Sequence, residues 1–338
     1  MNILQPNLRL FNKNYNLGKN QIIFASLAAD VHTPVSTLIK FKKEKYLFFF
    51  ESVEKGSQKG RFSIIGLKPD LIWQCKNNLC TINDLKKNKK IIKKENDPLK
   101  SLRKLVSSNK VNIPKILPGI SSGLFGFLGY EMIQYFENLK LKKKDNLDLP
   151  ESVFLRPSIT LVFDNVSDKL YITKLVSPNN LSASYSFKKG VNDIKKIVNK
   201  INKPLKQLNL KTYSFDKKVN IFKNVKSNTS FQEFKKMVNT AKKYIFEGEI
   251  FQVVLSRIFK KKINVEALSV YRALRNLNPS PYLFFMNFNK FNIVGSSPEI
   301  LIKLKDNKVT IRPIAGTRKR GINQVEDLKM EKDLLNDP

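Results

Sequence analysis

The sequence predicts an α+β fold in which antiparallel sheets pack against a minority of helices. Residues 46–50 (YLFFF) form a short apolar run, which predicts a buried strand. Residues 70–74 and 79–82 flank Asn77 and Asn78, and this pattern is typical of a hairpin. Helical spacing is confined to a few segments between such hairpins, so the sheets are expected to be antiparallel and not parallel.

The first part of the chain is rich in predicted strands. Residues 61–66 indicate a second short strand, and residues 156–164 and 169–173 indicate a further pair. Residues 86–94 are rich in lysine and are expected to form a connection. The leucine spacing in residues 98–106 predicts a helix.

The second part is marked more clearly. Ser230 and Glu233 form a capping box, which predicts a helix that ends at Gly248. A strand is expected over residues 250–259 and a helix over residues 266–277. The polar, lysine-rich stretch between the two parts places a domain boundary so that residues 1–215 form one region and residues 216–338 the other.

Composition limits the function classes. The chain has 338 residues with 62 basic and 28 acidic side chains, for a net charge of +34. The lysines are spread over the whole chain, which favours a solvated surface with weak attraction for small anions over a nucleic-acid interface. No apolar stretch of about 18 residues and no secretory pattern occurs, so a cytoplasmic protein without membrane spans is expected. Cys75, Cys80 and the single histidine, His32, do not make a zinc motif.

The segment 312–318 (RPIAGTR) carries the clearest chemistry. Gly316 would let backbone amides approach a ligand, and Thr317 adds a hydroxyl group. Arg318 and Arg320 add charge that suits a carboxylate. These residues alone are equally typical of a hairpin exit with exposed basic side chains.

Several motifs in one order resemble the chorismate-binding enzymes, and among them the large subunits of anthranilate synthase. The resemblance covers nearly the whole chain. The segments that carry it are 33–36 (TPVS), 50–52 (FES), 60–63 (GRFS), 126–131 (GFLGYE), 248–256 (GEIFQVVLS), 278–282 (NPSPY), 295–299 (GSSPE) and 312–318.

Two positions separate the branches of this family. In the resembled aminodeoxychorismate synthases a nucleophilic lysine stands at the place of Ala315, and in isochorismate and salicylate synthases a water-activating lysine stands at the place of Gln252. Alanine has no amine and glutamine is not a base at neutral pH. The resemblance therefore implies free ammonia as the nucleophile and anthranilate and pyruvate as products, with Mg²⁺ as cofactor.

Site residues are carried over from the same resemblance. Gly316 and Thr317 are expected to contact chorismate. Glu51 and Ser52, with Pro281, Tyr282 and Leu283, are expected to form a feedback site for L-tryptophan. The alternatives are a surface turn for the first pair and ordinary strand packing for the second group.

The resemblance also implies a partner and a missing part. The partner is a glutamine amidotransferase subunit, component II, which supplies ammonia and often forms a heterotetramer with component I. The sequence stops inside a helix pattern at Pro338, so we expect the catalytic histidine and the metal ligands beyond it, and an inactive fragment. The alternatives are aminodeoxychorismate synthase component I and a non-catalytic protein that binds tryptophan.

Overall fold

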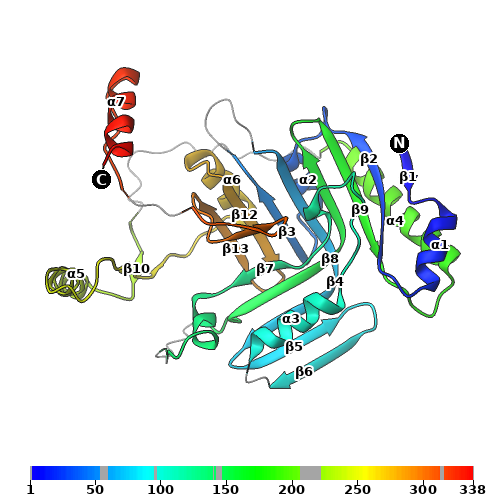
Figure 1. Cartoon of the computed structure of the whole chain (residues 1–338), viewed down its shortest axis with the longest axis horizontal. Helices are drawn as coiled ribbons and strands as arrows, with labels where there is room; N and C mark the ends of the chain where they lie inside the picture. The colour runs from blue at the N-terminus through cyan, green and yellow to red at the C-terminus, as the bar shows by residue number, and fades with distance from the viewer. Residues whose placement is uncertain are drawn as a thin grey trace. The chain divides into compact units, whose positions relative to one another are not determined.

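The computed structural model describes residues 2–53, 60–94, 97–139, 141, 147–205, 222–312 and 316–337. The chain divides into two compact units, one of Met1–Lys203 with Tyr271–Pro338 and the other of Pro204–Val270. The predicted boundary between residues 215 and 216 falls in 206–221, outside the described residues, so the division at that point stays a prediction. Figure 1 labels the elements along the chain.

The first unit is built on one antiparallel sheet, as the fold-class prediction requires. Its main path runs in the order β1-β2-β9-β8-β4-β3-β12-β13, with β5 and β7 pairing β4 and β8, and β6 pairing β5. The strands are β1 (Asn2–Gln5), β2 (Gln21–Ala28), β3 (Tyr46–Glu51), β4 (Phe62–Lys76), β5 (Leu79–Asp84), β6 (Lys89–Lys94), β7 (Phe125–Leu128), β8 (Ser152–Asp164), β9 (Lys169–Val176), β12 (Tyr282–Phe288) and β13 (Asn292–Ser297). The α+β class is confirmed.

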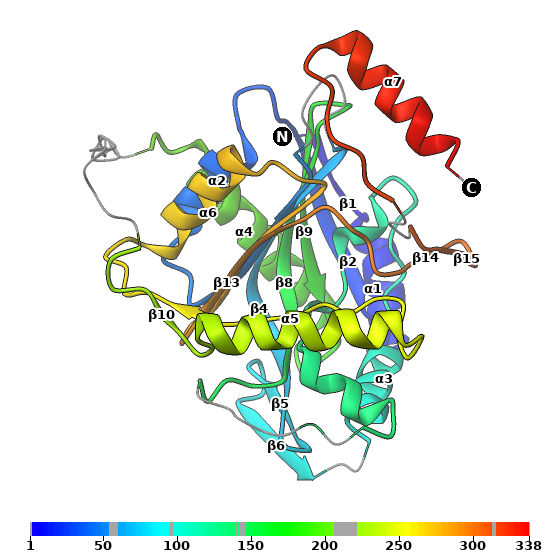
Figure 2. The same ribbon diagram turned by 90° about the vertical axis from the view of Figure 1, so that its left-hand side faces the viewer.

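Helices pack on this sheet through apolar faces. In the first unit α4 contacts β2 and β9, α1 packs on α4, α2 contacts β4, and α3 contacts β5. Figure 2 shows α2 and α4 on the same side of the strands. The helical elements are α1 (Leu8–Asn16), α2 (Pro34–Phe41), α3 (Pro98–Ser108), η1 (Gly119–Ser121), η2 (Tyr130–Tyr135), α4 (Ala183–Asn202), α6 (Ala267–Leu277) and α7 (Gln324–Leu335).

Two predicted features of the first part differ from the structure. The expected strands at 61–66 and 70–74 are one strand, β4, whose register on β8 shifts between Pro69 and Leu71. Proline has no N–H to donate to the neighbouring strand, which accounts for the irregularity at this point. The expected lysine-rich connection contains β6, whose pairing among the described strands is with β5 alone. Lysines are a common protection for such an edge strand against pairing with other chains.

The second unit contains α5 (Phe231–Phe246) and a short antiparallel pair, β10 (Lys226–Ser227) and β11 (Phe259–Lys260). The predicted capping box is confirmed, because the Glu233 N–H donates to Ser230 Oγ at 3.2 Å and the Ser230 N–H to Glu233 Oε2 at 2.7 Å. Gly248 follows the helix at φ +76°, as expected of a residue that ends it.

The strand expected over residues 250–259 is wrong. Residues 251–258 have no regular structure, and pairing begins only at Phe259. The apolar run predicted a strand, but β10 offers two residues for pairing, so the rest of the run has no ladder partner among the described strands. Phe251 is consequently 95% exposed.

Residues 303–310 form a separate hairpin in the first unit, β14 (Lys303–Lys305) and β15 (Lys308–Thr310). It contains the turn expected at Asp306 and Asn307, both of which have positive φ. The hairpin leads directly to the segment that carries the predicted chorismate contacts.

Candidate functional site

The pairing of β3 with β12 unites two segments that are far apart in the sequence. Leu283 lies opposite Glu51 in the antiparallel register, and Val53 N–H donates to Ser280 O at 3.0 Å (Figure 1). The predicted pair Glu51 and Ser52 therefore lies beside the predicted group that begins at Pro281. Leu283 is buried at 1% exposure. Tyr282 precedes it on the strand, so its side chain points to the opposite face of the sheet, and it is 42% exposed.

Glu51 is a buried carboxylate whose partners the sequence did not suggest. Its Oε1 accepts hydrogen bonds from Arg275 Nε at 2.6 Å and from the Tyr271 hydroxyl, and its Oε2 accepts from Arg275 Nη2 at 3.3 Å. Both partners lie on α6 with the spacing i, i+4, which places them on one helix face. The i, i+4 spacing within the predicted helix indicates that Tyr271 and Arg275 share a face. No sequence pattern indicates that this face contacts Glu51.

Burial and charge shift the pKa values of this cluster. Burial raises the pKa of Tyr271 well above its ordinary range, and the Glu51 carboxylate raises it further. The hydrogen bond to Glu51 raises the pKa of Arg275. Tyr271 is also packed edge-on against Phe49, with ring centroids 5.5 Å apart. In this cluster the neutral phenol of Tyr271 and the charged guanidinium of Arg275 both donate hydrogen bonds to the buried carboxylate of Glu51.

Ser52 follows Glu51 at the point where β3 ends. A Cβ at Gly60 would lie 1.9 Å from Ser52 Cβ, so the chain passes Ser52 at a distance that only glycine allows. Within the described part of the chain, the Ser52 hydroxyl has no hydrogen-bond partner and can bond a ligand.

The predicted chorismate contacts, Gly316 and Thr317, are exposed and lie near the last helix of the chain. A Cβ at Gly316 would come within 3.0 Å of Leu334 Cδ1 on α7. Arg318 Nε donates to Asp333 Oδ2 at 2.6 Å, and this bond raises the pKa of Arg318.

Arg318 and Arg320 are therefore not free charges. Arg320 Nη2 lies 2.6 Å from Asp327 Oδ2, so both Arg318 and Arg320 pair with carboxylates of α7. Their visible role is to hold the segment after Thr317 on that helix, and the predicted anion contact is left to backbone N–H groups and the Thr317 hydroxyl.

Of the two positions that distinguish the branches, the structure describes only Gln252. Gln252 is exposed in the irregular segment 251–258 of the second unit. Ala315 lies in 313–315, outside the described residues.

Within the described ranges, no group of three or more His, Cys, Asp or Glu side chains could hold a metal ion. Within the same ranges, no helix combines the length and the apolar character that crossing a membrane requires.

Residues 48–338 match the sequence profile of a family described as chorismate binding enzyme. A curated relative from Cereibacter sphaeroides, named anthranilate synthase component 1, is 39% identical over 330 residues, which cover 97% of this chain and 65% of the relative. A relative of the same name from Aquifex aeolicus is 31% identical, with 100% and 66% covered. The chain thus spans slightly less than two thirds of the length of these relatives.

Solved structures give the same grouping. Anthranilate synthase component I from Streptococcus pneumoniae matches with a TM-score of 0.64 and 27% identity, covering 92% of this chain and 63% of that one. The isochorismate synthase MenF from Escherichia coli matches with a TM-score of 0.56 at 16% identity, a likeness of fold alone.

Proposed function

The chain belongs to the chorismate binding enzyme family, and on this premise we propose that it is part of component I of an anthranilate synthase. The whole enzyme converts chorismate and ammonia to anthranilate, pyruvate and water. The observation that carries the proposal is the shared name of relatives that are 31% to 39% identical along almost the entire chain.

Gln252 and Ala315 support this branch of the family. Neither side chain can act as an amine nucleophile or as a base for water, so ammonia from solution or from a partner adds to the ring of chorismate. Loss of water and elimination of pyruvate then give the aromatic product. Gly316 and Thr317 contact the substrate in this proposal, through backbone N–H groups and a hydroxyl. The partner is a glutamine amidotransferase, component II, and the location is the cytoplasm.

The resemblance also implies Mg²⁺. The residues that the structure describes do not fit this ion, because they form no cluster of three carboxylate, histidine or cysteine side chains. No step of the proposed reaction is therefore assigned to the metal.

A tryptophan site at the junction of β3 and β12 forms the regulatory part of the proposal. Within the described residues the Ser52 hydroxyl has no hydrogen-bond partner. The pairing of Leu283 with Glu51 and the hydrogen bond from Val53 N–H to Ser280 O support a site that also includes Pro281 and Tyr282. Glu51 is already bound by Tyr271 and Arg275, so its part is to hold the end of β3 in place for Ser52.

Product analysis tests the activity. The longest polypeptide that the reading frame encodes is incubated with chorismate, an ammonium salt and Mg²⁺, and the products are separated by chromatography. Anthranilate with equimolar pyruvate is expected. Aminodeoxychorismate or isochorismate as the main product would assign the protein to another branch.

Calorimetric titration of L-tryptophan tests the regulatory site, on the 338-residue chain shown by circular dichroism to be folded. Binding is expected, and Ser52→Ala should weaken it roughly tenfold or more, since one hydrogen bond to a charged group is lost. Ser107→Ala, an exposed serine on α3, serves as the matched control. Equal affinity of the two variants would remove Ser52 from the site.

A further inference from the structure

A cavity lies in the first unit, and its lining contains no residue of β3 or β12. It has a volume of about 510 Å³ and is bounded by α3, the segment after it, residues 122–124 and β8. This volume is in the range of small-molecule sites. Its walls are mostly apolar and include Leu102, Val106, Ile113, Leu124 and Phe154.

The apolar wall residues are partly buried side chains that pack against two separate hydrophobic clusters. Leu102, Leu124 and Phe154 pack against the cluster around Trp73. Val111 and Ile113 pack against the cluster around Phe48 and Val162. The cavity is therefore a gap between two well-packed regions, and its shape is set by side chains that are anchored on both sides.

One buried cation lines this cavity. Arg156 is 9% exposed, and its Nε donates to Asp70 Oδ1 at 2.6 Å, while its Nη1 donates to Asn109 Oδ1. A guanidinium has five N–H donors. Within the described residues these two bonds leave the Nη2 group of Arg156 without an acceptor. Because Arg156 lines the cavity, this group can donate to a ligand carboxylate there, and such charge-assisted bonds are the stronger ones.

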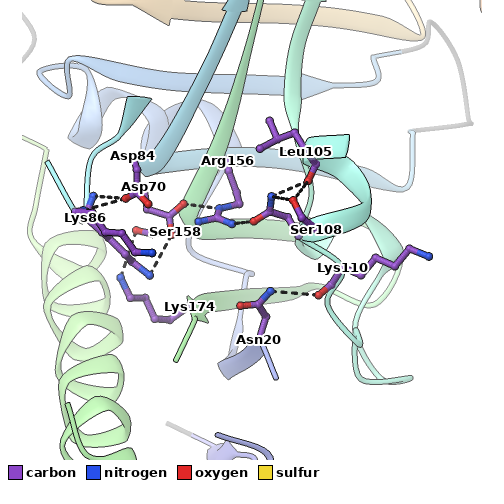
Figure 3. A network of polar contacts seen from close by, with 12 residues as sticks. Asn20, Asp70, Asp84, Lys86, Leu105, Ser108, Lys110, Arg156, Ser158 and Lys174 are labelled. Carbon is purple, nitrogen blue, oxygen red and sulfur yellow. Dashed lines mark hydrogen bonds and ion pairs between the residues drawn. The ribbon is translucent and has the colours of Figure 1, made fainter. Parts of the chain in front are cut away.

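The charges around Arg156 also favour an anion. Asp70 is 3% exposed and is shared by two cations, because Lys86 Nζ lies 3.1 Å from its Oδ2 (Figure 3). Lys174 is paired separately with Asp193 at 3.1 Å. Asp84, whose Oδ1 accepts the Lys86 N–H at 3.0 Å, brings the carboxylates of this network to the number of its cations, so the excess positive charge comes from the cavity lining itself. Lys110 on the cavity lining adds a further positive charge.

We propose that this cavity binds a small apolar monocarboxylate, whose carboxylate accepts hydrogen bonds from Arg156 and whose hydrocarbon part fills the space between Leu102, Val106 and Phe154. The forked geometry of arginine suits a carboxylate. The lining of the cavity shares no residue with the proposed chorismate and tryptophan sites.

Benzoate and benzamide test the charge requirement, since they share one shape and differ in charge. Both are titrated into the folded chain and followed by ligand-observed NMR and calorimetry. Saturable binding of benzoate with a Kd below about 1 mM is expected for a ligand of this size, with benzamide about tenfold weaker or more. Absence of benzoate binding, or equal binding of the two compounds, overturns the proposal.

Two substitutions locate the binding. Val106→Trp fills the cavity from α3 without touching the ion pairs, and Val106 is 52% exposed, so the fold tolerates the change. Val166→Trp, at a position that is 71% exposed and outside the cavity, is the matched control. Benzoate binding should be lost in the first variant and kept in the second. Binding that survives Val106→Trp places the ligand elsewhere and also overturns the proposal.

Discussion

Arg275 Nε donates to Glu51 Oε1 at 2.6 Å, and this ion pair joins the end of β3 to α6. Glu51 is 5% exposed, and a buried carboxylate that loses its cation keeps an uncompensated charge. The pair therefore fixes the strand end that the proposed tryptophan site uses.

Arg275→Met should lower the free energy of unfolding by roughly 2–4 kcal/mol, toward the lower end because the arginine side chain is 34% exposed. Urea unfolding followed by fluorescence of Trp73, which is completely buried, measures this loss. The double variant Glu51→Gln with Arg275→Met should recover part of it. No recovery would mean that Arg275 acts through packing and not through the Glu51 charge.

Asp164 should make stability depend on acidic pH. Burial raises its pKa, but hydrogen bonds from Arg61, Val166 N–H and Ser167 outweigh burial, and the pKa is lowered overall. A lowered folded-state pKa contributes stability above the ordinary aspartate value, and this is lost as pH falls through the lowered value. Between pH 5 and pH 3 the urea midpoint of Asp164→Asn should therefore fall less than the midpoint of the control variant Asp30→Asn. Parallel acid losses in both variants would contradict this.

Gly126→Ala should be poorly tolerated. A Cβ there would lie 1.8 Å from Val153 O, a backbone atom of the paired strand β8, so β7 must move away. The cost of such overpacking is roughly 1–3 kcal/mol or more. Gly119→Ala is the control, because nothing lies within 4 Å of its added Cβ. Thermal unfolding of both variants gives the comparison, and similar midpoints would show that β7 is loosely paired.

Cys75 should be inert in the folded protein. Burial, followed by the neighbouring Cys80 and Glu151, raises the pKa of its thiol to about 12. Since the thiolate is the reactive form, labelling by a disulfide reagent at pH 8 should be slow until urea unfolds the chain. Val166→Cys supplies an exposed thiol for reference. If both native cysteines of the folded protein were labelled as fast as the thiol of Val166→Cys, the prediction that Cys75 is protected by burial would be wrong.

Ser230→Ala should destabilise α5 by about 1 kcal/mol, because the capping box loses its side-chain acceptor. Hydrogen exchange of the first-turn amides of α5 should accelerate about fivefold, and Asn239→Ala, at an exposed site within the helix, should leave them unchanged. Equal exchange in both variants would show that the cap is not what protects the first turn.

Local signals in the sequence predicted the elements that depend on near neighbours. The capping box at Ser230, the run that forms β3 and the hairpin at Asn77 and Asn78 appear as expected. The strand expected after Ile250 failed because an apolar run forms a strand only when another strand supplies its hydrogen bonds.

The sequence by itself determined the fold class, the family and which segments carry the candidate chemistry, because turn residues, periodicity and motifs are encoded over a few neighbouring positions. Only the tertiary structure decided that Glu51 meets Arg275 and that Leu283 lies opposite Glu51. It also decided that Arg318 and Arg320 pair with α7 instead of standing free. Such contacts depend on strand register and helix packing, and these are set by the burial of the whole core and not by any local pattern.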